Sequence, residues 1–230
     1  MSSQVIAQSD IGSWGGLEIL APINKKFKIG AEVQIRHDNN FGRLTNAFGA
    51  GWLNYHPNKH FIISGGYRLS ALPYNTDVIN LVPTHRYTAD FTFKKIPDLF
   101  KEDPKLNVAI RLRATTEYEP ARQTEMYLRG RIKLEHPTMA KKVTLFAAGE
   151  WFYHINNQIH YTNTEVIATH AIDKFRFKYG AYIKPAKRHR IKVFGMYQRL
   201  IMSQTNEFIV GLGYRYKFKK MIKKKVEEGK

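Results

Sequence analysis

Apolar and polar side chains alternate along most of this chain, one residue after the other. In the stretch NVAIRLRATTEY, Val108, Ile110 and Leu112 fall on one face, and Arg111 and Arg113 fall on the other. Successive side chains of a β-strand point to opposite faces, whereas a helix would mix these residues around its surface. The alternation therefore predicts strands with one apolar face and one strongly charged face.

Turn-forming sequences such as HDNNFG, HPNKH and YEPARQ separate the alternating runs. The runs are about 10–13 residues long; strands of soluble proteins average about 5–6 residues, and a tilted strand of about 9–11 residues spans a bilayer. No Ser/Gly linker, repeat or low-complexity block divides the chain. We predict about twelve strands, near residues 13–21, 25–36, 43–56, 60–70, 85–95, 105–117, 124–135, 142–153, 163–172, 175–184, 189–201 and 207–218.

The alternation leaves two arrangements open, which differ in the face that points inward. In a soluble β-sandwich or a lipocalin-like barrel, the apolar face points inward and the charged face meets water. In an outer-membrane barrel the faces are inverted, so the apolar face meets lipid and the charged face lines the lumen.

We predict the second arrangement: an all-β chain that forms a single antiparallel outer-membrane β-barrel of about twelve strands. The predicted strands are long and consecutive, and Arg occupies mid-strand positions while Lys gathers at turns. Aromatic residues, among them Trp14, Trp52 and Trp151, lie toward strand ends, as in the girdle of a membrane barrel. Arg that faces Glu or Asp suits a packed, partly desolvated interior, so Arg111 and Arg113 are predicted to point into the barrel.

The predicted barrel comprises residues 13–218. Residues 1–12 are interpreted as an N-terminal extension with the remainder of a leader, because VIAQ resembles the end of a signal peptide cleaved after Ala7. Residues 219–230, KKMIKKKVEEGK, form a basic C-terminal tail.

Composition narrows the choice of partners. The 230 residues carry a net charge of +18 and include no cysteine, which excludes disulfides and thiolate metal sites. Such a charge suggests an anionic partner, namely nucleic acid, phospholipid or lipopolysaccharide phosphates. Nucleic acid fits poorly, because the aromatic residues lie on the predicted lipid face and do not interleave with a basic groove. We predict outer-membrane lipids and lipopolysaccharide as partners, with other outer-membrane proteins as further candidates.

Several short motifs follow one another in a characteristic order. After Trp14 come VQIRHD, GGYRLS, THRYTADF, IRLRATTEYE, YLRGRIKLEHP, FAAGEWFYHIN and GLGYRYKF. Over most of residues 10–218, this order resembles a family of Bacteroidota outer-membrane proteins known only as a domain of unknown function. The resemblance implies a small outer-membrane barrel and implies no activity.

The charged residues of the predicted inward face form the candidate site, and Arg outnumbers Asp and Glu among them. One interpretation is a salt-bridge network that fills a narrow barrel and fixes its shape, because burial penalises any unpaired charge. The other is an anion-selective pore or a site for acidic sugars, with a positive lumen. The candidates are Glu18, Glu32, Arg36, Arg68, Arg86, Asp90, Arg111, Arg113, Glu125, Arg129, Arg131, Glu150, Arg176 and Arg215.

Enzymatic and metal chemistry have weaker signals. Some outer-membrane barrels are phospholipases with a Ser–His pair supported by Asn, but no His-x-Ser spacing occurs here. His154, His160 and His170 lie in a loop-rich region, whereas Ser64 and Ser70 lie on a separate predicted strand. His56 and His60 flank the turn HPNKH and are interpreted as solvated residues rather than metal ligands. No P-loop or dinucleotide-binding glycine motif occurs. We therefore predict no catalytic site, no metal and no cofactor.

The distribution of basic turns conflicts with an even strand count. With about twelve strands, the basic turns divide between the two ends of the barrel. If residues 155–173 formed a long external loop instead, the basic turns would share one end, but eleven strands would remain, against the even-number rule. We keep about twelve strands. The basic residues concerned are Lys25, Lys26, Lys59, Lys94, Lys95, Lys101, Lys105, Lys141, Lys142, Lys187, Arg188, Lys219 and Lys220.

The predicted function is non-enzymatic. The chain is interpreted as a structural or accessory subunit of an outer-membrane assembly, or as a narrow barrel with a charged Arg/Glu lumen. The alternative is a porin-like channel selective for anions or acidic sugars, and a remote alternative is an outer-membrane lipid hydrolase.

Overall fold

The structure, a computed structural model, describes residues 9–38, 40–73, 81–94, 105–120, 124–140, 142–155, 158–161, 166–169, 172–201 and 203–219. No helix in this part of the chain is long and apolar enough to cross a membrane. The described residues form the strands β1 (Ser9–Pro22), β2 (Phe27–Asp38), β3 (Arg43–Tyr55), β4 (Phe61–Pro73), β5 (Leu81–Lys94), β6 (Asn107–Tyr118), β7 (Glu125–Pro137), β8 (Val143–His154), β9 (Gln158–Tyr161), β10 (Val166–Thr169), β11 (Ile172–Ile183), β12 (His189–Leu200) and β13 (Asn206–Lys217).

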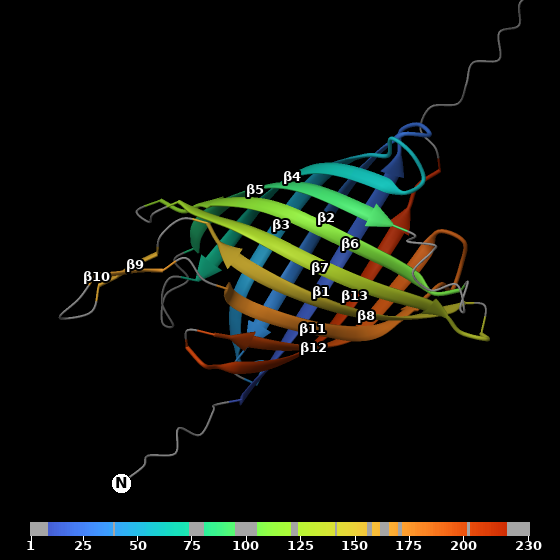
Figure 1. Ribbon diagram of the computed structural model, residues 1–230. Helices are drawn as coiled ribbons and strands as arrows, with labels where there is room; N and C mark the ends of the chain where they lie inside the picture. Colours follow the sequence, from blue (N-terminus) through green and yellow to red (C-terminus); the bar gives the residue numbers. More distant parts are fainter. Residues whose placement is uncertain are drawn as a thin grey trace, which may run out of the picture.

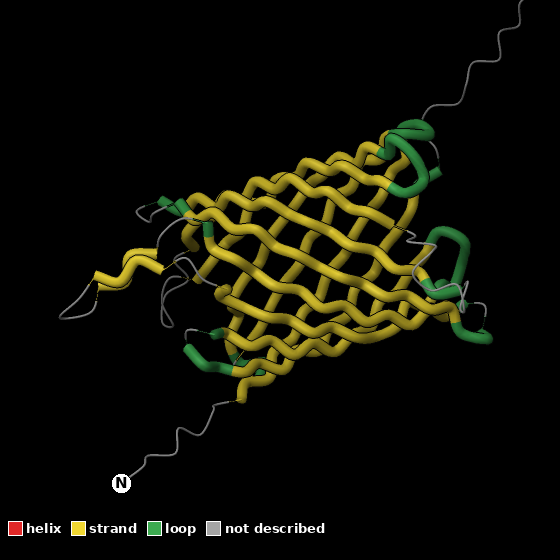
Figure 2. The backbone as a smooth tube through the Cα atoms, in the orientation of Figure 1, coloured by secondary structure: helices red, strands yellow, loops and turns green. Residues whose placement is uncertain are grey.

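Eleven of these strands close into a barrel, in the order β1-β13-β12-β11-β8-β7-β6-β5-β4-β3-β2 (Figures 1 and 2). Neighbours that follow each other in the barrel sequence run antiparallel, whereas β1 and β13 close the barrel in parallel. Parallel closure follows from the odd count, because alternation then gives the first and last strands the same direction. The predicted all-β barrel is confirmed.

The strand predicted over residues 163–172 is not a barrel strand. β9 and β10, of 4 residues each, form a separate two-stranded sheet that projects from one end of the barrel (Figure 1). β8 pairs directly with β11 and bypasses this excursion. Strands this short cannot span the height of the barrel, so the wall has eleven strands instead of about twelve.

The bypass places the basic turns at one end of the barrel, which we call the lysine-rich end. It comprises the connections after β1, β3, β5, β7 and β11 and the chain after β13, and the described residues of these segments include no Asp or Glu. Burial and the neighbouring Lys28 and Lys94 lower the pKa of His56 in the β3–β4 turn, so this histidine adds no charge at neutral pH. Among the predicted basic residues, those outside the described part of the chain are Lys95, Lys101, Lys141 and Lys220.

The outer surface of the barrel is apolar. Leu17, Leu112 and Leu212 expose 58%, 56% and 59% of their surface. The charged side chains at alternate positions are shielded, with side-chain exposures of 13% for Arg111 and 4% for Glu150. This is the inverse of a soluble barrel, whose apolar side chains would fill the interior.

The interior between β8, β11, β12 and β13 also contains an apolar cluster. Phe146, Phe194, Met196 and Ile209 are buried there, and Trp14 packs against them. This cluster narrows the interior on one side of the barrel.

A glycine on β11 allows close approach of β12. A Cβ added to Gly180 would lie 2.1 Å from the carbonyl oxygen of Val193, which is backbone and cannot rotate away. We expect Gly180→Ala to lower the free energy of unfolding by about 1–3 kcal/mol, measured by urea titration of the folded protein in detergent. Gly149→Ala is the matched control, because nothing lies within 4 Å of its added Cβ. Equal losses in both variants would contradict the close-packing argument.

A candidate anion pathway in the barrel interior

The charged residues selected from the sequence all lie on the inward face of the barrel wall. Their positions alternate with the exposed apolar residues along each strand, and the strand registers bring them into neighbouring rows. Two acidic residues, Asp90 on β5 and Glu150 on β8, organise most of the arginines between them.

Asp90 holds Arg113 in a two-point contact. The two residues lie directly opposite each other on β5 and β6. Arg113 donates from Nε to Oδ1 of Asp90 at 2.5 Å and from Nη2 to Oδ2 at 2.6 Å. Nη1 of Arg111 lies 4.0 Å from Oδ2 of the same carboxylate, which is beyond hydrogen-bond distance. Asp90 is therefore committed to Arg113.

Glu150 is the most enclosed carboxylate of the network, with 5% of its surface exposed. Arg129 donates from Nη2 to its Oε2. Its Oε1 lies 3.9 Å from Nη2 of Arg111 and 3.9 Å from Nη1 of Arg131. Arg176 on β11 lies directly opposite Glu150 in the register. One carboxylate thus neutralises a group of four arginines only in part.

A second group lies nearer the end opposite the lysine-rich end. Arg86 donates from Nη2 to Oε2 of Glu117, and the hydroxyl of Tyr127 donates to the same oxygen. The Tyr127 oxygen also lies 3.2 Å from Oε2 of Glu125. Neither Glu117 nor Tyr127 was selected from the sequence, although both follow the same alternation as the residues that were.

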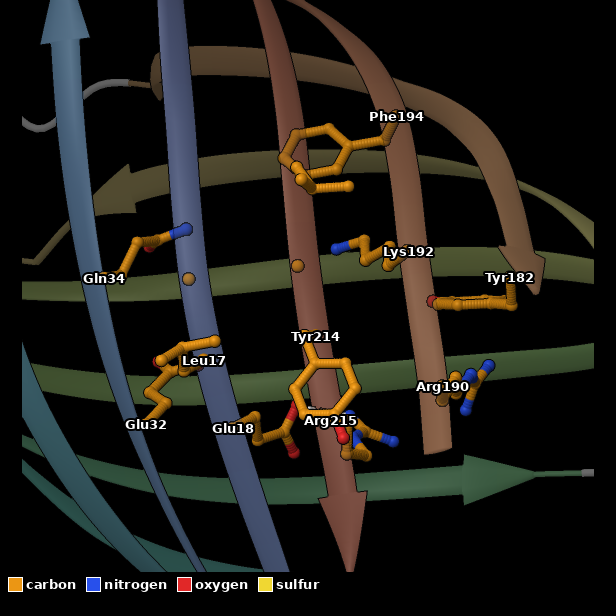
Figure 3. A pocket seen from close by; sticks show the side chains of 13 residues that line it. Leu17, Glu18, Glu32, Gln34, Tyr182, Arg190, Lys192, Phe194, Tyr214 and Arg215 are labelled. Atoms are coloured by element: carbon orange, nitrogen blue, oxygen red, sulfur yellow. Dashed lines mark ion pairs between the residues drawn. The ribbon is translucent and has the colours of Figure 1, made fainter. Parts of the chain in front are cut away.

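A cavity of about 90 Å³ lies inside the wall formed by β1, β2, β12 and β13 (Figure 3). Arg215 and Glu18 form an ion pair of 2.7 Å on its lining. Lys192 and Gln34 point toward each other from β12 and β2. No carboxylate of the described residues lies within ion-pair distance of Lys192. The lining thus carries three cations, Arg190, Lys192 and Arg215, against the two carboxylates of Glu18 and Glu32.

Cations also stack on aromatic rings in the interior. The guanidinium carbon of Arg36 lies 4.0 Å from the ring centre of Trp14, and that of Arg176 lies 5.3 Å from the same ring. Trp14 was predicted to belong to a membrane girdle, and the structure places it inside the barrel. Trp52 was also assigned to the girdle; it too faces inward, because its ring covers Gly30 on the Glu32 face of β2. Alternation along each strand sets these orientations, because Trp14 lies on the face of Glu18 and Trp52 lies opposite Gly30 on the face of Glu32.

Arginines lie directly opposite one another at four places in the wall. Two of these pairs, Arg111–Arg131 and Arg113–Arg129, are adjacent on β6 and β7. The others are Arg68–Arg86 and Arg190–Arg215. Like charges at directly opposite positions destabilise an antiparallel pair, so these positions need counter-charge.

The inward acids are too few to supply that counter-charge. They are Glu18, Glu32, Asp90, Glu117, Glu125, Glu135, Glu150, Asp173 and Glu207. The inward cations are more numerous and comprise Lys28, Arg36, Arg68, Arg86, Lys94, Arg111, Arg113, Arg129, Arg131, Lys133, Lys174, Arg176, Lys178, Arg190, Lys192 and Arg215.

Comparison with known proteins places this barrel in a family. Residues 11–209 match DUF2490, described as a protein of unknown function. The chain belongs to the DUF2490 family. Among solved structures, a KdgM porin is similar, with 16% sequence identity, 88% of this chain and 90% of that chain covered, and a TM-score of 0.47. No curated protein matches the chain.

This DUF2490 protein carries further interior charges that sequence reasoning did not select. They obey the same alternation as the selected residues, and those on β11 and β12 share their inward face with glycine or aromatic residues. These additional residues are Glu117, Lys133, Glu135, Lys174, Lys178, Arg190, Lys192 and Glu207.

The histidine and serine residues considered for catalysis have other partners. Ser64 donates from Oγ to Oδ1 of Asn54 at 2.6 Å, and Nε2 of His154 lies 3.5 Å from Oδ2 of Asp173. These two groups lie on different strands and are not paired with each other. Within the described ranges, no group of three or more His, Asp or Glu could hold a metal ion.

Proposed function

We propose that this DUF2490 protein is an integral outer-membrane β-barrel that forms a narrow, anion-selective channel. Its role is non-enzymatic, needs no cofactor, and requires outer-membrane lipids around the barrel. The Bacteroidota origin implied by the sequence motifs is part of the same proposal.

The outward apolar face supports the membrane setting. Side chains such as Val33, Leu112, Phe177 and Leu212 expose about half of their surface in the isolated chain. An apolar surface of this extent is unfavourable in water and is matched by lipid. The barrel strands have 12–14 residues, which suffices for a tilted strand to cross the hydrocarbon core.

The surplus of inward cations carries the channel proposal. A network that only filled the barrel would balance its charges, because an unpaired buried charge costs several kcal/mol. Here four pairs of arginines lie directly opposite each other, and the acids cannot neutralise them all. The remaining counter-charge must come from water and mobile anions, so the interior must be hydrated and must attract anions.

Single-channel recording tests this proposal. We expect the purified protein in planar bilayers to give steady conductance in KCl, and a salt gradient to give a reversal potential of the sign that chloride permeation produces. The barrel should conduct weakly, because Trp14 and the apolar cluster narrow the interior. Insertion without conductance, or selectivity for potassium, would contradict the proposal and favour a structural subunit with a closed interior.

A further inference from the structure

Two arginines at the centre of the network lack hydrogen-bond acceptors. Arg111 and Arg131 lie directly opposite each other on β6 and β7. Their closest carboxylate oxygen is the shared Oε1 of Glu150, at 3.9 Å from each. Neither makes a hydrogen bond with another described residue, and the Nε atoms of both are buried without a partner. Their terminal amino groups therefore present unused donors to the lumen.

The neighbouring pair, Arg113 and Arg129, has the hydrogen-bond acceptors that Arg111 and Arg131 lack. Arg113 is held by both oxygens of Asp90, and Arg129 donates to Oε2 of Glu150. These hydrogen bonds occupy both oxygens of Asp90 and Oε2 of Glu150, and they hold the guanidinium groups of Arg113 and Arg129 in place. Arg113 and Arg129 thus each donate to a carboxylate, whereas Arg111 and Arg131 have no carboxylate oxygen within hydrogen-bond distance.

Two facing guanidinium groups suit one kind of ligand. Each presents planar N–H donors that match the oxygens of a carboxylate or phosphate group in a two-point contact. An oxyanion between them would also remove the like-charge repulsion across the strand pair. Chloride would relieve the repulsion but would not match the paired donors.

We propose that Arg111 and Arg131 form a binding site for an oxyanion, the carboxylate or phosphate group of a solute in the lumen. This inference deepens the proposed channel function and rests on it, because the solute must enter the interior. Oxyanions bind between the two arginines, so they permeate slowly and hinder the passage of chloride.

The test measures binding separately from conduction. Inorganic phosphate and malonate are titrated into the detergent-solubilised barrel by isothermal calorimetry, and both are added to bilayers that carry a chloride current. We expect binding of at least one of them and a corresponding fall in chloride current. Phosphate alone as ligand would identify a phosphate group, and malonate alone would identify a carboxylate; either result supports the site.

Substitutions separate a discrete site from general positive charge. We expect Arg111→Gln and Arg131→Gln to weaken binding about tenfold or more. Arg131→Lys keeps the charge and the fold but loses the planar donor pair, so it should weaken binding as well. Lys28→Gln is the control, because it removes one inward cation at the lysine-rich end of β2, which lies four strands from β6 in the wall, and it should change affinity less than about twofold.

Three outcomes would overturn the site: unchanged affinity in the arginine variants, equal loss in Lys28→Gln, or chloride binding as tight as that of both oxyanions. The two measurements test the channel proposal and the binding-site proposal independently. Oxyanion binding without conductance overturns the channel and keeps the site, whereas anion-selective conductance without binding keeps the channel and overturns the site.

Discussion

Glu150→Gln is expected to lower the free energy of unfolding by about 3–5 kcal/mol. The carboxylate exposes 5% of its surface and faces Arg111, Arg129 and Arg131. The amide keeps the shape but removes the charge, so the arginines around it lose their shared counter-charge and repel one another. Urea unfolding of the folded protein in detergent, followed by tryptophan fluorescence, measures the loss.

A more exposed ion pair supplies the control. Glu18 pairs with Arg215 at 2.7 Å, but the Arg215 side chain is 36% exposed, so Glu18→Gln should cost about 1 kcal/mol or less. Adding Arg131→Gln to Glu150→Gln should recover part of the lost stability, because it removes one of the unbalanced charges. A Glu150→Gln variant as stable as the parent would show that water screens the interior completely, and the network would then have no structural role.

Labelling of single introduced cysteines is expected to show which end of the barrel faces the cell exterior. The chain contains no cysteine, so a single introduced thiol is the only target. The turns after β1, β3, β7 and β11 are short, whereas the opposite end carries the β9–β10 excursion. Outer-membrane barrels have short periplasmic turns and longer extracellular loops, so we place the lysine-rich end in the periplasm.

Two exposed positions at opposite ends report this orientation. Ser203→Cys lies in the turn between β12 and β13, and Lys187→Cys lies at the lysine-rich end. With a membrane-impermeant maleimide, Ser203→Cys should react in intact cells, and Lys187→Cys should react only after the outer membrane is permeabilised. The reverse pattern would contradict the orientation, and equal reaction of both in intact cells would contradict the transmembrane placement.

The proposed orientation places the basic turns next to headgroups of the periplasmic leaflet. Lys25, Lys26, Lys59 and Lys142 lie in turns at this end. Phospholipid phosphates are then their natural partners, and lipopolysaccharide contacts would lie at the other end. The same cations also raise the local concentration of anions at the periplasmic mouth, which favours entry into the positive lumen.

Part of the site was predictable because side-chain direction in a strand is local. The alternation around Arg111 assigns this residue to the face opposite Leu112, and the structure agrees. Partners were not predictable, because they depend on register between strands. Glu150 on β8 forms ion pairs with Arg111 on β6 and with Arg129 on β7. This sharing follows only from the assembled wall.

Two of the three tryptophans assigned to the girdle, Trp14 and Trp52, show where local reasoning failed. Proximity to a strand end does not say which face a residue takes, and alternation places Trp14 on the side of Glu18. Inside the barrel its ring lies against Arg36 and contacts Phe194, which comes from the other end of the chain. Arg36 lies directly opposite Trp14 on the neighbouring strand β2, whereas the contact with Phe194 on β12 exists only once β1 closes the barrel against β13.

The sequence by itself determined the strands, the inversion of apolar and charged faces, and the inward direction of the arginines, because each depends on neighbouring residues. Tertiary structure decided the count of eleven barrel strands, the parallel closure of β1 on β13 and the pairing of each charge. The direct pairing of β8 with β11 across the β9–β10 excursion is a non-local choice. It is settled by closing the wall and satisfying its backbone hydrogen bonds, which no local pattern encodes.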